Sequence, residues 1–319
     1  MPIPQPRSGE TDSEFMNRCM SDPTMVNEYP RQDQRAAVCS AQLGKQKAYN
    51  PRGWATTDRY RGQFRRKYRP ILRDTFDQMS KPLFDIDYTP VSGVIDQLKG
   101  ATLIKQDEVY KFYKRMIPDV ALYFAKLDYK KAKSIAGNEI EVKSPITGLR
   151  AKQGEEEQIL EDIWMQQFID FVEQDLGTKI VSVTGQTRDM HINLLEKVLK
   201  ENSNLGMDSN FIELKDKLKE KYILNRRYRL NRIIRTETSF ASNHGSLTGM
   251  NSTGKNYEKT WIAAMTNTRD AHVIANNQTV KKDEYFTVMN EQLLYPCDLH
   301  GSAENVINCR CTTSYQIIR

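Results

Sequence analysis

The stretch from residue 235 to residue 311 gives the most specific indication of the fold. Its pieces, in order, are Arg235-Thr236-Glu237-Thr238, Trp261, Thr268-Arg269-Asp270-Ala271-His272, Pro296-Cys297-Asp298 and Ile307-Asn308-Cys309-Arg310-Cys311-Thr312. The first piece falls in a helical pattern, and the later ones fall among short strands and loops. We therefore expect an α+β domain at the C-terminal end of the chain.

The helix predicted over about 224–242 carries an acidic residue on its apolar face. Glu237 lies three and four residues from apolar positions of that face, which are Leu230, Ile233, Ile234 and Ala241. An ionised carboxylate buried without a partner costs several kcal/mol. We expect Arg269 to supply the matching cation.

Short strands are predicted after this helix, and helices before it. Apolar and β-branched residues alternate over 260–265, 285–288 and 312–318. Helical periodicity marks 155–176, the stretch around 194–199 and a helix that starts near residue 210. The predicted fold class is a mainly α N-terminal region with an α+β C-terminal domain of helices and short strands.

Four segments follow from shifts in composition. Residues 1–10 are rich in proline and predicted to be disordered, and residues 11–44 form a helical hairpin. Residues 45–150 form a long-helix region, and residues 151–319 form the C-terminal domain. In the hairpin, Cys19 and Cys39 occupy apolar positions, so we expect two reduced cysteines that pack against each other.

The long helix predicted over 54–82 bears a row of arginines. The row consists of Arg61, Arg65, Arg69 and Arg73, with Arg59, Arg66 and Lys67 beside it. Like charges four residues apart on a helix cost a few tenths of a kcal/mol per pair. The row is either a solvated face or a contact with packaged DNA or an acidic protein surface. Pro70 should kink or break this helix, and Pro118 should interrupt a later one.

Composition excludes several classes of protein. The net charge is +6, and 28% of the residues are charged against 39% hydrophobic, a polar balance that favours exposed helices and partners. No window is apolar enough for a membrane span, and the N-terminus lacks a signal sequence. The five cysteines then favour reduced thiols or metal ligands over a disulfide framework.

One set of residues has the chemistry of a zinc site. His272, Cys309 and Cys311 offer an imidazole and two thiolates, and Cys297 or His300 could supply the fourth ligand. The competing interpretation is a set of reduced, packed cysteines beside a hydrogen-bonded histidine.

Together, the pieces between residues 235 and 311 resemble the minor head protein family of tailed phages, named for the phage Mu F protein and also called the phage head morphogenesis domain. The resemblance covers the domain at residues 151–319. The residues that carry it, besides the candidate ligands, are Arg235, Glu237, Trp261, Arg269 and Asp298. The chain departs from the family at Cys297, where the family usually has glycine, and at Met265-Thr266-Asn267, where it commonly has an aspartate.

The resemblance implies a low-copy minor head protein associated with the portal vertex, inside the capsid, that aids head assembly and DNA packaging or delivery. Its partners would be the portal protein, other head proteins and packaged DNA. It would lie in the virion, and in the host cytoplasm during assembly, without a membrane.

No phosphate-binding loop, Gly-x-Ser-x-Gly or His-Glu-x-x-His motif is present, so we expect no enzyme and no cofactor beyond a structural zinc ion. The alternative is a zinc-dependent nucleic-acid enzyme or a toxin-like transferase built on the C-terminal domain.

Overall fold

A computed structural model of the chain describes residues 3–5, 7, 10, 12–32, 34–36, 38–39, 42, 53–85, 106–136, 155–201 and 211–318. The chain divides into two compact units that interleave along the sequence. Unit 1 comprises Met1–Gln63, Val120–Asp162 and Arg235–Arg319. Unit 2 comprises Phe64–Asp119 and Ile163–Ile234. The predicted boundary near residue 150 lies outside the described residues, as does half of the segment 1–10, so the four predicted segments stay predictions.

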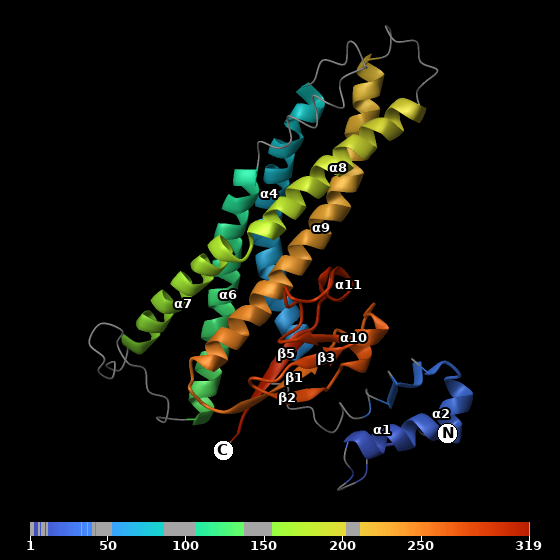
Figure 1. Ribbon diagram of the computed structural model, residues 1–319, viewed down its shortest axis with the longest axis vertical. Helices are drawn as coiled ribbons and strands as arrows, with labels where there is room; N and C mark the ends of the chain where they lie inside the picture. Colours follow the sequence, from blue (N-terminus) through green and yellow to red (C-terminus); the bar gives the residue numbers. More distant parts are fainter. Residues whose placement is uncertain are drawn as a thin grey trace. The chain divides into compact units, whose positions relative to one another are not determined.

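Helices dominate, and short strands occur only near the C-terminal end of the described chain (Figure 1). The helices are α1 (Asp12–Ser21), α2 (Pro23–Glu28), α4 (Trp54–Asp85), α6 (Gln106–Ala136), α7 (Glu155–Gln174), α8 (Gly177–Glu201), α9 (Phe211–Asn251), α10 (Asp270–Ile274) and α11 (Ala303–Val306). The strands are β1 (Tyr257–Ile262), β2 (Thr279–Lys281), β3 (Phe286–Val288), β4 (Glu291–Leu293) and β5 (Thr312–Ile317). The predicted fold class is confirmed.

Two expectations about helix ends are wrong. Neither proline breaks its helix, since α4 continues through Pro70 and α6 through Pro118, although proline removes one backbone hydrogen bond; a kink at Pro70 stays a prediction. Both helices bury residues on either side of the proline, such as Tyr68 and Leu72 in α4, so tertiary packing outweighs the local loss. The two helices predicted from about 210 and from 224 are one helix, α9, because no glycine or proline separates them.

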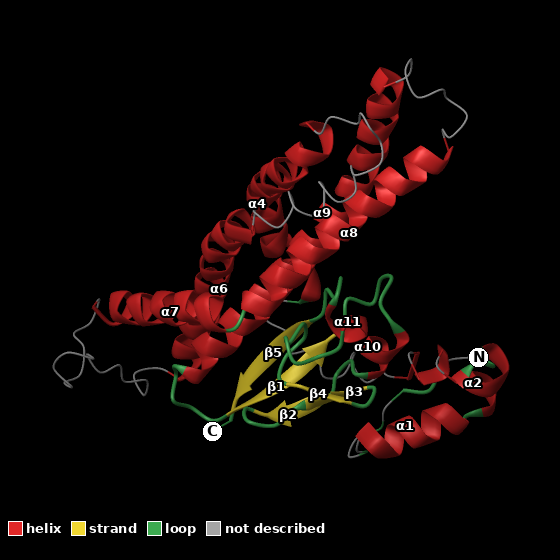
Figure 2. Cartoon of the chain, turned by 45° about the horizontal axis from the view of Figure 1, so that its top comes forward, coloured by secondary structure: helices red, strands yellow, loops and turns green. Residues whose placement is uncertain are grey.

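Unit 1 contains an antiparallel sheet with strand order β2-β1-β5 and a separate hairpin of β3 and β4 (Figure 2). Alternation along β1 buries Tyr257, Lys259 and Trp261 on one face. The Trp261 ring lies edge-on to Phe286 of β3, with ring centroids 5.4 Å apart. These contacts form the core on which the site described below rests.

Two glycines allow α9 to approach α6 closely within unit 1. A Cβ atom added at Gly245 would lie 2.1 Å from the carbonyl oxygen of Ala121. One added at Gly249 would lie 2.3 Å from that of Ala125. Since the obstacles are backbone atoms, only glycine fits at either position.

Unit 2 is built on the packing of α8 and α9 with the end of α4. Its apolar cluster consists of Leu83, Leu194, Leu195, Val198, Leu218 and Tyr222. A buried polar group adjoins it: Ser80 Oγ lies 3.0 Å from His191 Nε2 and 2.6 Å from the hydroxyl of Tyr222. Arg229 of α9 donates to the carbonyl of Val183 at 3.1 Å.

Cys19 of α1 forms a disulfide with Cys39, which follows α2 in the chain. The expectation of two reduced cysteines is therefore wrong. Their Cα atoms are 5.9 Å apart, within the range that a disulfide spans. Both are fully buried, with Phe15 and Met25 packed around them. The sequence argument against a disulfide rested on the missing signal sequence. Whether the bond can form depends on the distance between the two Cα atoms, which the sequence does not give.

No helix within the described ranges combines the length and the apolar character needed to cross a bilayer.

Candidate metal centre

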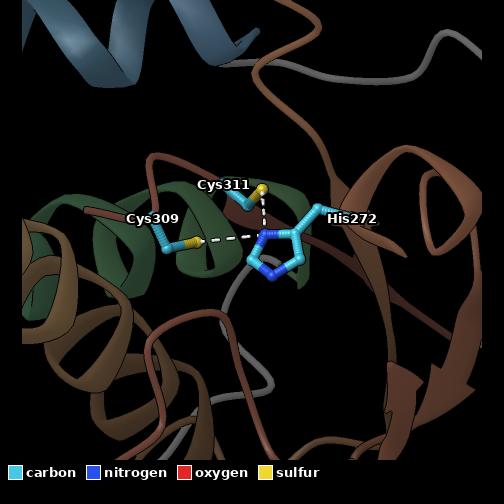
Figure 3. Close-up of side chains that lie close together, drawn as sticks. All are labelled: His272, Cys309 and Cys311. Carbon is cyan, nitrogen blue, oxygen red and sulfur yellow. Dashed lines mark hydrogen bonds between the residues drawn. The ribbon is translucent and has the colours of Figure 1, made fainter. Parts of the chain in front are cut away.

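Three predicted zinc ligands come together in unit 1. The candidate ligand atoms of His272, Cys309 and Cys311 all lie within 4.8 Å of one another. Nδ1 of His272 faces both sulfurs, at 3.5 Å from Sγ of Cys309 and 3.4 Å from Sγ of Cys311 (Figure 3). All three side chains are buried. This arrangement can hold a soft divalent cation.

The imidazole of His272 is fixed by its surroundings. His272 lies on α10, and the indole of Trp261 stands at 86° to its ring with centroids 5.5 Å apart. Nε2 lies 3.3 Å from Oδ1 of Asn305, which is buried on α11. With Nε2 protonated toward that amide oxygen, the lone pair of Nδ1 points at the sulfurs.

The Arg235-Thr236 pair holds the turn that presents Cys309. Oγ1 of Thr236 accepts a hydrogen bond from the backbone N–H of Asn308 at 2.8 Å. Arg235 donates to the side-chain oxygen of Asn308 at 2.9 Å. Asn308 has φ 62°, a left-handed conformation that asparagine tolerates. The start of the sequence motif thus positions its end.

Arg61 supports the same segment from inside the protein, which corrects its expected place in a surface row. Its side chain is 0% exposed and donates to the carbonyls of Arg310 at 2.9 Å and Cys311 at 3.2 Å. It also donates to Ser242 Oγ at 2.6 Å and Asn243 Oδ1 at 3.0 Å. The four-residue spacing of the row did not distinguish Arg61 from the exposed arginines, because the burial of a side chain depends on the helices that surround α4.

Asn243 joins two cysteine-bearing segments to α9. Its amide nitrogen donates to the carbonyl of Pro296 at 2.7 Å and to that of Cys311 at 3.2 Å. We did not predict this residue from the sequence. The helical spacing could have indicated it, because Asn243 follows Thr236 by seven residues, or two helical turns, and so lies on the same face of α9.

Asp298 organises the turn around Cys297. Oδ2 of the buried Asp298 accepts from the backbone N–H of Leu294 at 2.8 Å, and Oδ1 lies 2.8 Å from Nδ1 of His300. Lys259 of β1 donates to the carbonyl of Leu294 at 2.9 Å. Within this turn Cys297 is fully buried, and its Sγ lies 3.6 Å from the carbonyl oxygen of Cys309.

The region that contains this site matches a known family. The family described as phage Mu protein F like protein matches residues 187–314. This part of the chain is similar to the phage Mu F-like family. Comparison with curated proteins and with solved structures gave no match.

The match confirms the resemblance inferred from the sequence and indicates a phage head-related protein. The phage Mu F-like region includes every candidate ligand, together with Thr236, Asn243 and Asp298. Arg61, which holds the same segment, precedes the matched residues in the chain.

The structure buries Glu237 and gives Arg269 a backbone partner, and the pairing of these two residues stays a prediction. Glu237 is buried, at 3% exposure, as its place on the apolar face of α9 predicted. The guanidinium of Arg269, however, donates to the backbone carbonyl of Ile307. Arg269 thus holds the segment before Cys309, because it lies in a loop next to that segment and remains exposed.

The thiols of the cluster differ in acidity. Burial raises the pKa of the Cys297 thiol. Hydrogen bonds from Cys297 and Cys311 lower the pKa of Cys309 well below its usual range. Cys309 therefore ionises first, and a thiolate there is the form that binds a metal ion.

A surface pocket of about 160 Å³ opens beside the cluster. Besides the three candidate ligands, it is lined by residues 267–269, Asn308 and Arg310. Cys297 does not line it. A metal ion held by the three residues would therefore have a solvent-facing side at the pocket and a core-facing side toward Cys297.

Proposed function

We propose that the chain is a minor head protein of a tailed phage that associates with the portal vertex, inside the capsid, and aids head assembly and DNA packaging or delivery. The observation that carries this proposal is the match of residues 187–314 to the phage Mu F-like family. The matched residues include both the Arg235-Thr236 pair and Asn308, to which this pair is hydrogen-bonded in the segment that carries Cys309.

The basic row of α4 supports a contact with an acidic partner, in a revised form. Arg61 is buried, and Arg65 is only partly exposed. Arg66, Arg69 and Arg73 are exposed, and their spacing of three and four residues places them on one face of α4 in unit 2. Within this row Arg73 pairs with Asp74, both half-exposed or more, and Lys67 beside the row pairs with Asp119.

Such a row suits phosphates or surface carboxylates, since each arginine offers several charge-assisted donors. The partners that we propose are packaged DNA and the portal protein, with other head proteins at the same vertex. The protein would thus reside in the virion, and in the host cytoplasm while heads assemble.

Affinity capture from phage-producing cells tests this proposal. The tagged full chain is purified, and the proteins that co-purify are identified and counted by quantitative mass spectrometry. We expect portal protein, with few copies of this chain per portal ring. Capture of host proteins or nucleic acid alone, without any head protein, would contradict the proposal.

A double variant tests the contact surface separately. Arg66→Glu with Arg69→Glu should reduce recovery of the partner at least tenfold and leave the circular dichroism spectrum unchanged. The matched control is Arg188→Glu with Lys197→Glu on α8, which changes the charge of unit 2 equally. Equal recovery from both double variants would show that the row is only a solvated face.

A further inference from the structure

We propose that Cys297 completes a closed zinc site, in which Zn²⁺ is bound by Nδ1 of His272 and by the thiolates of Cys297, Cys309 and Cys311. This inference does not rest on the proposed function, because it concerns only the packing and chemistry of unit 1.

The spacing of the first three ligands already fits a tetrahedral ion. With Zn–S near 2.3 Å and Zn–N near 2.0–2.1 Å, the edge between a sulfur and a nitrogen of a tetrahedral site is about 3.5 Å. The two distances from His272 Nδ1 to sulfur are 3.5 Å and 3.4 Å. An ion can enter by displacing the thiol protons, with little movement of these side chains.

Cys297 occupies a backbone conformation that favours glycine. Its φ is 68°, and a non-glycine residue in this region costs roughly 1–2 kcal/mol. The turn is held from both ends, by Asp298 at the N–H of Leu294 and by Asn243 at the carbonyl of Pro296. Despite this strain the position holds a cysteine and not a glycine, and its thiol lies next to Cys309. Metal binding would explain why a cysteine stands there.

The sulfur of Cys297 does not line the pocket, and it lies outside the group of ligand atoms that are all within 4.8 Å of one another, so its side chain must rotate to reach an ion there. It is fully buried, 3.8 Å from the carbonyl of Val306 and 3.6 Å from that of Cys309. Without metal, the thiol is a donor to these oxygens. Zinc binding would replace both contacts with a bond to the metal ion.

His300, the other candidate fourth ligand, is directed elsewhere. Its side chain is 91% exposed, and its Nδ1 bonds with Asp298. An imidazole this exposed faces solvent and not the buried cluster.

Two buried groups fit the charge of a zinc–thiolate cluster. Asn305 holds Nε2 of His272, as the outer partners of metal-bound histidines do. The indole N–H of Trp261 is buried with no acceptor at hydrogen-bond distance within the described chain, and it neighbours the sulfur of Cys311. A thiolate at Cys311 would give that N–H an acceptor.

A closed site has a structural role, since no position is left for water or substrate. It would fix α10, the 294–300 turn and the 307–311 segment to one another. An open site, with water in the fourth position on the pocket side, would instead fit the metal-dependent enzyme considered from the sequence.

Metal analysis of the full chain, purified without chelators, tests this inference. We expect about one Zn²⁺ per chain, with X-ray absorption fitting three sulfurs at about 2.3 Å and one nitrogen. Absence of bound zinc together with no uptake of added Zn²⁺ would overturn the inference. So would two sulfurs with an oxygen in the first coordination sphere.

Cys297→Gly is the decisive variant, because glycine keeps the turn and relieves its backbone strain while removing the thiol. We expect zinc affinity to fall at least tenfold, and the sulfur-to-metal charge-transfer absorption of the Co²⁺ form to weaken. His300→Gln serves as the control and should change neither quantity. An unchanged affinity and an unchanged Co²⁺ spectrum in Cys297→Gly would overturn the assignment.

Discussion

Thr236 accepts a hydrogen bond from the backbone N–H of Asn308 at 2.8 Å, across 72 residues of sequence. This contact joins the first and last pieces of the phage Mu F-like signature. It explains why a short polar motif on a helix and a Cys-x-Cys segment occur together, since the helix supplies the support on which the thiols are presented.

Thr236→Val should lower the free energy of unfolding by about 0.5–1.5 kcal/mol, because the backbone N–H of Asn308 loses its acceptor while the side-chain volume is kept. Urea denaturation measures the change. Thr248→Val on the same helix is the control, since Thr248 Oγ1 bonds only to the carbonyl of His244 in its own helix. Equal losses in the two variants would mean that the Asn308 contact contributes nothing specific.

Arg61→Lys should destabilise unit 1 by about 3 kcal/mol, although the charge is retained. A lysine ammonium cannot reproduce the planar set of donors that serves Ser242, Asn243 and two carbonyls. Arg69→Lys, on the exposed face of the same helix, should change stability by less than about 0.5 kcal/mol. Thermal melting of both variants measures these changes. An unchanged melting temperature in Arg61→Lys would refute the role assigned to Arg61.

His191 should make stability depend on pH. Burial and the nearby charge of Arg229 lower the pKa of His191 from its ordinary value of 6.5 to about 4. The unfolded chain therefore binds the proton more readily, so stability is fully retained above about pH 6.5 and falls as the pH drops toward 4. The total change attributable to this residue is about 3 kcal/mol.

The measurement for His191 is the difference between wild type and His191→Gln in denaturation at pH 7 and at pH 4.5. Glutamine does not titrate, so the variant should lose less stability over this interval than wild type does. Parallel pH profiles would show that protonation of His191 is not linked to folding.

Gly245→Ala should destabilise the packing of α9 on α6 by about 2 kcal/mol or more, because the new methyl group would overlap the backbone of Ala121. Gly185→Ala in α8 is the matched control: the position has open space around it, so alanine should be neutral or slightly stabilising there. Thermal melting of the two variants should move in opposite directions. A neutral Gly245→Ala would contradict the close approach of the helices.

The sequence predicted those features that depend on local pattern. The apolar stripes located most helices, and alternation located β1, β3 and β5. His272, Cys309 and Cys311 were recognised as a group because imidazole and thiolate are zinc ligands, and the structure brings them together.

Features set by distant contacts were missed. Arg61 shares its four-residue spacing with exposed arginines, and only the approach of α9 and the 310–311 segment buries it. The Cys19–Cys39 bond depends on how two helical segments pack, and Arg269 donates to the backbone carbonyl of Ile307, a contact that the sequence did not predict. Residue type alone does not distinguish these outcomes.

The most direct test of the proposed head function is the protein composition of purified heads from the phage that encodes this chain. Quantitative mass spectrometry of intact heads, before and after DNA release, gives the copy number of each protein relative to the portal. The proposal predicts this chain in full heads at low copy, comparable to the portal. Its absence from both full heads and assembly intermediates would contradict a role as a minor head protein.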